Sequence, residues 1–154
     1  MDEERLQLVE RIGRAIAGLT TEKDILATTA RMIDAFSDDF NWTGFYMMRK
    51  GVLEVGPYCG PRTEHVQIEL NRGICGAAAS QKKTLIVEDV RSDSRFLACS
   101  LTTRSEIVVP LLDGDRVLGE IDIDSDRPGN FTAEDREMLE AIAGLVVDRL
   151  RAVS

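Results

Sequence analysis

The order of apolar and polar residues predicts helices at both ends of the chain. Between residues 2 and 18, apolar side chains recur every three or four positions, the spacing of one stripe along a helix. A second stripe runs from Ile25 to Phe36, after Thr21 and Asp24, whose separation is typical of a helix N-cap. A third follows the segment 132–135. The pattern therefore predicts two opening helices and one closing helix.

Between these helices the apolar pattern changes to the two-residue period of β-strands. A short segment rich in small residues, 73–82, interrupts the strands and predicts a short helix. Asp113-Gly114-Asp115, between two apolar runs, predicts a hairpin, and a loop is expected at Gly56–Pro61. The predicted strands cover residues 41–50, 51–58, 65–70, 84–90, 106–112 and 117–124.

This order of elements predicts an α/β fold of the α+β type. We expect a central, mostly antiparallel sheet on which the N-terminal and C-terminal helices pack. A chain of 154 residues has the length of one domain, so a single domain over 1–154 is predicted. Residues 91–104 follow neither period, and long irregular segments of compact domains are more often functional than idle. This segment is predicted to be a lid over a pocket.

Composition excludes several classes of partner. The chain carries 19 basic and 27 acidic residues, and a net charge of −8 opposes binding to nucleic acid or to an anionic membrane. No apolar run approaches the roughly 18 residues of a membrane-spanning helix, and the first residues are acidic rather than basic as in a signal peptide. We therefore expect a cytoplasmic protein with no nucleic-acid or membrane partner.

The thiols leave two interpretations open. Cys59, Cys75 and Cys99 are too few for a disulfide framework, and neither their spacing nor the single histidine, His65, indicates structural zinc. They are either inert residues of the core, the commoner case, or redox-active groups.

An acidic patch is predicted on the last strand. Asp122 and Asp124 lie two residues apart, so their carboxyls project from one face about 7 Å apart. A three-residue turn at 113–115 would place Glu106 directly opposite Asp122, whereas a two-residue turn would send Glu106 to the other face. Three neighbouring carboxyls can bind an ammonium group, and one of them should retain a proton and act as an acid.

Two alternatives accompany this patch. The carboxyls could bind a divalent cation, but no DxDxDG spacing is present, so no metal is predicted. Trp42 and Tyr46, four residues apart on one predicted strand, share a face. They are either core aromatics, the commoner case, or a wall against which a small cation packs.

A set of motifs in fixed order resembles one known family, the free methionine-(R)-sulfoxide reductases, which are stand-alone GAF domains. The joint occurrence of GICG, ACS and SEIVVP is the most specific part of the resemblance. The matching segments are NWTGFY, the glycine-rich loop 56–60, NRGICGAAA, VEDV, LACS, SEIVVPL and GEIDIDS.

The resemblance implies a reaction and the residues that perform it. Cys99 of the ACS segment would be the catalytic nucleophile, and Cys75 of GICG would resolve its sulfenic acid by forming a disulfide. Electrons would come from a thioredoxin-like reductant, no metal or organic cofactor would be needed, and a homodimer is possible. The implied binding residues for free methionine sulfoxide are Trp42, Tyr46, Glu106, Asp122 and Asp124.

One departure from the family pattern concerns the third cysteine of many members, where this chain has His65. Cys59, six residues earlier, is either a substitute or merely a loop cysteine, and the second interpretation is favoured. Two alternatives to the enzyme remain: a GAF domain that senses a small ligand without chemistry, and an interaction module. Sensors are generally joined to an output domain, and the 154 residues carry none, which favours the enzyme.

Overall fold

The computed structural model describes residues 1–95 and 102–154 and contains one sheet with helices on both faces. Its elements are α1 (Glu3–Ile16), α2 (Glu22–Asp34), β1 (Trp42–Arg49), β2 (Val52–Cys59), β3 (Gln67–Glu69), α3 (Gly73–Gln81), β4 (Leu85–Val87), a 3₁₀ turn (Val90–Ser92), β5 (Ser105–Asp113), β6 (Arg116–Ser125) and α4 (Ala133–Val153).

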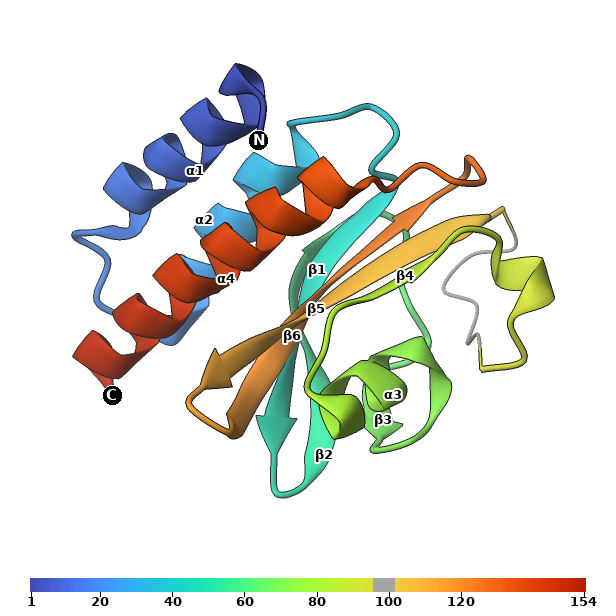
Figure 1. The fold of residues 1–154 in the computed structure, drawn as a ribbon. Helices are drawn as coiled ribbons and strands as arrows, with labels where there is room; N and C mark the ends of the chain where they lie inside the picture. Colours follow the sequence, from blue (N-terminus) through green and yellow to red (C-terminus); the bar gives the residue numbers. More distant parts are fainter. Residues whose placement is uncertain (96–101) are drawn as a thin grey trace.

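The sheet has the strand order β3-β2-β1-β6-β5-β4, and every neighbouring pair is antiparallel. Helices α1, α2 and α4 cover one face, and α3 lies against the other (Figure 1). The predicted α+β fold, with terminal helices packed on a central antiparallel sheet, is therefore confirmed.

The predicted helix starts are confirmed by their caps. The Thr21 hydroxyl accepts a hydrogen bond from the backbone N–H of Asp24 at 3.2 Å. Thr132 and Asp135 form a reciprocal capping box at the start of α4. Each cap satisfies backbone donors that the first turn of a helix leaves unpaired. The apolar stripes of these helices then form the larger core against the sheet.

Strand β6 separates two environments. Ile121 and Ile123 are buried in the core beneath α1, α2 and α4. The alternate residues Glu120, Asp122 and Asp124 point to the face that α3 covers, and each is at most 1% exposed. An acidic row at the centre of a sheet is thus enclosed between that sheet and a helix.

Two boundaries differ from the predictions. Strand β2 continues to Cys59 through most of the predicted Gly56–Pro61 loop, because its register with β1 shifts between Gly44 and Tyr46 and so accommodates an extra residue. The predicted strand 84–90 ends at Val87, and a 3₁₀ turn follows it.

Part of the predicted lid cannot be placed. Of the segment 91–104, residues 96–101 lie outside the described residues. Within the described part of the chain, no helix has the length and apolar character needed to cross a membrane.

Candidate active site

The carboxyls predicted to cluster share one sheet face, although their pairing differs from the prediction. Glu106 lies opposite Asp124, and Val108 lies opposite Asp122, so the expected Glu106–Asp122 pairing is wrong. All three acidic side chains nevertheless belong to the face covered by α3, because pairs two residues apart along antiparallel strands keep the same orientation.

A β-bulge explains why Glu106 lies on the same sheet face as Asp122 and Asp124 although the predicted register was wrong. The hairpin has a two-residue turn, since Asp113 pairs with Arg116, and that turn alone would have sent Glu106 to the opposite face. The pairing shifts between Leu111 and Leu112, which adds one residue to the β6 side. The extra residue shifts the pairing by one position, so the side chain of Glu106 points to the same sheet face as the other carboxyls.

The acidic row is buried with few polar partners at two positions. Among the described residues, the carboxyls of Glu120 and Asp122 have no hydrogen-bond partner beyond Cys75 and Glu106. Burial raises the pKa of Glu120 well above its usual value, and the charge of Asp122 adds to the shift. Burial also raises the pKa of Asp122. Such groups hold a proton more readily than exposed carboxyls do, so this face can supply an acid.

The thiol of Cys75 faces this acidic row. Cys75 is the third residue of α3 and is 5% exposed. Its Sγ atom and carboxylate oxygens of Glu106 and Asp122 all lie within 4.8 Å of one another. Burial raises the pKa of Cys75 well above its usual value, and the charges of Asp122, Glu120 and Glu106 raise it further. The thiol is therefore kept protonated, although a helix N-terminus by itself favours the thiolate.

Trp42 and Tyr46 form an aromatic wall on the same face. Their rings stack with centroids 6.0 Å apart, and Tyr58 continues the stack 4.9 Å from Trp42. The Tyr46 hydroxyl donates to the backbone oxygen of His65, and the Trp42 indole N–H donates to that of Pro61. These hydrogen bonds fix both rings against the loop that follows β2.

A small cavity lies where these groups meet. Its volume is about 10 Å³, room for about one water molecule. Trp42 and Asp124 do not line it among the described residues, although they are paired in neighbouring strands. The lining comprises Tyr46, His65, Ile68, Ile74, Cys75, Glu106 and Asp122.

The structure separates the cysteines. Cys59 is the last residue of β2 rather than a loop residue, and it pairs with Thr43. Its neighbour Tyr58 stacks on Trp42, so the alternation of a strand directs Cys59 to the opposite face. On that face, burial raises the pKa of Cys59, and the negative charge of Asp34 on α2 raises it further. Cys99 lies outside the described residues.

Glu120 is the site residue that the sequence interpretation missed. It is fully buried on the acidic face and contributes to raising the pKa of Cys75. Its position two residues before Asp122 in an alternating strand was the signal that could have identified it. Only the burial of that face distinguishes it from a solvated glutamate.

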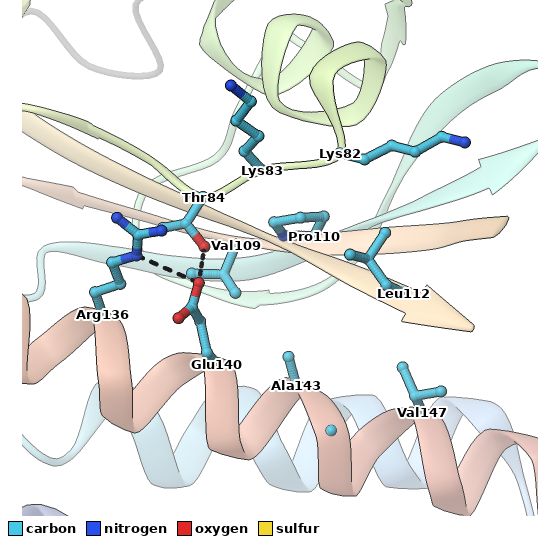
Figure 2. A pocket seen from close by; sticks show the side chains of 11 residues that line it. Lys82, Lys83, Thr84, Val109, Pro110, Leu112, Arg136, Glu140, Ala143 and Val147 are labelled. Carbon is cyan, nitrogen blue, oxygen red and sulfur yellow. Dashed lines mark hydrogen bonds and ion pairs between the residues drawn. The ribbon is translucent and has the colours of Figure 1, made fainter. Parts of the chain in front are cut away.

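Larger hollows lie elsewhere. A groove of about 450 Å³ runs between β5, α4 and the segment after α3 (Figure 2). Its floor is largely apolar, and Figure 2 shows Glu140 of α4 reaching towards Thr84. Glu140 accepts hydrogen bonds from Thr84 at 2.6 Å and from Arg136 at 3.3 Å. None of the predicted site residues that the structure describes lines this groove, so size alone does not locate the chemistry.

Comparison with known proteins agrees with this fold. The GAF domain family matches residues 22–150. A free methionine-R-sulfoxide reductase of Escherichia coli (strain K12) is 35% identical over 127 residues, which cover 82% of this chain and 76% of that protein. A protein of the same name from Saccharomyces cerevisiae is 41% identical over 112 residues, covering 70% and 62% respectively.

Solved structures extend the similarity to the whole fold. The crystal structure of free methionine-R-sulfoxide reductase from Neisseria meningitidis, in complex with its substrate, superposes with a TM-score of 0.93. It is 31% identical, and the superposition covers 99% of this chain and 93% of that one. The chain belongs to the GAF domain family and, within it, to the group of the free methionine-R-sulfoxide reductases.

Proposed function

We propose that the chain reduces free L-methionine-(R)-sulfoxide to methionine, with Cys99 as nucleophile and Cys75 as resolving thiol. The observation that carries the proposal is a buried row of carboxyls beside Cys75, bounded by aromatic rings. Membership of the reductase group supports the reaction class, which makes the chain an oxidoreductase.

The carboxyls suit the amine of a free amino acid. Asp122 is buried and has no cationic partner among the described residues, and a buried carboxylate without one carries a large desolvation cost. An ammonium group bound near Glu106, Asp122 and Asp124 would offset that cost. Trp42 and Tyr46 would pack against the substrate and keep water away. This arrangement favours free methionine sulfoxide over a residue inside a peptide.

The raised carboxyl pKa values supply the proton that the reaction consumes. The Cys99 thiolate attacks the sulfoxide sulfur, and one protonated carboxyl donates towards the sulfoxide oxygen as the S–O bond breaks. Methionine leaves, and the oxygen remains on Cys99 as a sulfenic acid. Asp122 is a candidate donor, because its burial favours the protonated form.

Cys75 has the properties of a second, resolving thiol. Its raised pKa makes it a poor first nucleophile, since the thiolate is the reactive form. In the second step its sulfur bonds to that of Cys99 and the sulfenic hydroxyl leaves as water. A thioredoxin-like dithiol would then reduce this disulfide and become oxidised itself.

The cytoplasmic location and the possible homodimer remain predictions.

A coupled assay tests the proposal. Thioredoxin, thioredoxin reductase and NADPH would be mixed with the protein and with the free R sulfoxide, the free S sulfoxide or a peptide-bound sulfoxide. We expect NADPH oxidation with the free R epimer only. Turnover of none of them would contradict the enzyme, and binding without turnover would instead support a ligand sensor.

A further inference from the structure

The donor atoms around the small cavity carry a second kind of chemistry. Cys75 contributes sulfur, and Glu106 and Asp122 contribute oxygen, with the donor atoms all within 4.8 Å of one another. All three residues line one cavity of about 10 Å³. That volume fits one water or one ion.

We propose that Cys75, Glu106 and Asp122 form a binding site for one Zn²⁺ ion in the reduced protein. The proposal differs from the sequence prediction of no metal, which weighed a zinc site of cysteine and histidine and a cation site of carboxyls separately. The thiol changes the donor set, because sulfur with oxygen ligands favours Zn²⁺ over Mg²⁺ or Ca²⁺. The site itself rests on these three side chains, whereas its loss on oxidation rests on the proposed disulfide between Cys75 and Cys99.

The buried carboxyl of Asp122 is the observation that points to a cation here. Asp122 is 1% exposed, lines the cavity, and has no hydrogen-bond partner among the described residues beyond the other two proposed ligands, Cys75 and Glu106. Glu120, which has no described partner beyond Cys75, adds a further buried carboxyl beside that thiol. Buried carboxyls of this kind are normally paired with a cation, hydrogen-bonded or neutralised by a proton.

The geometry needs only a small adjustment. In a tetrahedral zinc site with ordinary bond lengths, neighbouring sulfur and oxygen ligands are about 3.6 Å apart. The three donors would therefore move together by about 1 Å at most, within the range of side-chain rotation. A zinc ion would occupy the carboxyls proposed to bind the substrate amine, and it would also hold the proposed resolving thiol. Such an ion would inhibit the reductase reversibly.

The site should bind zinc only while Cys75 is reduced, because a disulfide sulfur is not a thiolate ligand. The experiment is competition between the full-length protein and a chromophoric zinc chelator, under anaerobic conditions after reduction. We expect one Zn²⁺ per chain, lost after oxidation to the disulfide. Cobalt substituted for zinc should show a sulfur-to-metal charge-transfer absorption. Mg²⁺ should not compete.

Variants identify the ligands. Cys75→Ser and Asp122→Asn should each weaken zinc binding by about tenfold or more, within the range seen when metal-site groups are lost. Cys59→Ser and Asp115→Asn should bind as the unchanged protein does, since Cys59 is directed to the other sheet face and Asp115 is an exposed turn residue. Glu106→Gln provides a second ligand variant if Asp122→Asn fails to fold by circular dichroism.

Three results would overturn the proposal. One is the absence of zinc binding at stoichiometric concentrations, and another is full binding by Cys75→Ser. The third is equal binding of Mg²⁺ and Zn²⁺, because carboxyls alone would then explain the site.

Discussion

At the scale of single residues, the environments of Cys75 and Cys59 favour different roles for these two thiols. Cys75 faces buried carboxyls, whereas Cys59 is directed to the face that α2 covers. Under the proposed mechanism only Cys99 starts the reaction. Cys99→Ser should therefore lower turnover by about a thousandfold or more, as loss of a nucleophile does. Quenched-flow measurement of methionine released in one turnover checks this, and stoichiometric release by that variant would contradict it.

The resolving thiol should behave differently in the same measurement. Cys75→Ser should release about one equivalent of methionine per chain and then stall, because the first attack does not use Cys75. Cys59→Ser is the matched control and should turn over normally. Normal multiple turnover by Cys75→Ser would remove it from the cycle.

Glu120 gives the molecule a pH-dependent stability. Its folded pKa is raised above the ordinary value of 4.5, so above that pH the folded state holds a proton that the unfolded state has lost. The contribution of Glu120 to stability is therefore greatest below pH 4.5 and falls as pH rises towards the folded pKa.

Glu120→Gln removes this titration. The free energy of unfolding of the variant, relative to the unchanged protein, should increase as pH rises from 4.5 to 7.5. Urea unfolding at several pH values measures it. Glu64→Gln, at an exposed loop position, should show no such trend. A difference that is independent of pH would show that the Glu120 carboxyl is not held protonated.

Residue types and alternation predicted much of the site. The shared face of Asp122 and Asp124 could be expected from the two-residue period, and Glu120 belongs to the same alternation. Glu106 joins that face through the bulge between Leu111 and Leu112 and not through the predicted three-residue turn. That the face is buried could not be expected, because a glutamate in an alternating strand is ordinarily solvated. The proximity of Cys75 to the carboxyls followed only from the resemblance, since it depends on how α3 packs over the sheet.

At the scale of elements, the hairpin shows what local patterns leave undetermined. Its position was predictable from Asp113-Gly114-Asp115, but its turn length and bulge were not. Both depend on packing on the two faces of the sheet, which the turn sequence does not contain. Caps such as Thr21 were predictable because they act within a few residues.

The close packing of α3 against the segment before it can be tested with substitutions at two glycines, Gly76 and Gly144. A Cβ at Gly76 would lie 2.7 Å from the backbone oxygen of Glu69 and 3.0 Å from the backbone nitrogen of Asn71. Gly76→Ala should therefore lower the free energy of unfolding by about 1–3 kcal/mol, the usual cost of overpacking. It should also slow turnover, because the adjacent Cys75 moves with α3.

Gly144 in α4 is the matched control, because nothing lies within 4 Å of a Cβ built there. Gly144→Ala should stabilise the protein by about 0.5–1 kcal/mol, the helix-propensity gain. Both values come from thermal or urea unfolding. Equal stability of the two variants would show that α3 does not press on the segment before it.

At the scale of the whole molecule, the two faces of the sheet have different roles, one in stability and the other in the proposed chemistry. One face packs on α1, α2 and α4 and forms the larger core, which stabilises the fold. The other holds buried charge, a thiol and aromatic rings beneath α3. The central claim is that this second face recognises a free amine, and substrate selectivity follows from it.

The most direct test compares kcat/KM for free and N-acetylated methionine-(R)-sulfoxide. Acetylation removes the positive charge and leaves the sulfoxide unchanged. A site built to pair a buried polar group rejects an analogue without it by large factors, so the free compound should be preferred by about a thousandfold or more. Asp124→Asn should lose most of that preference and still fold. Comparable kcat/KM values for the two compounds with the unchanged protein would contradict the account.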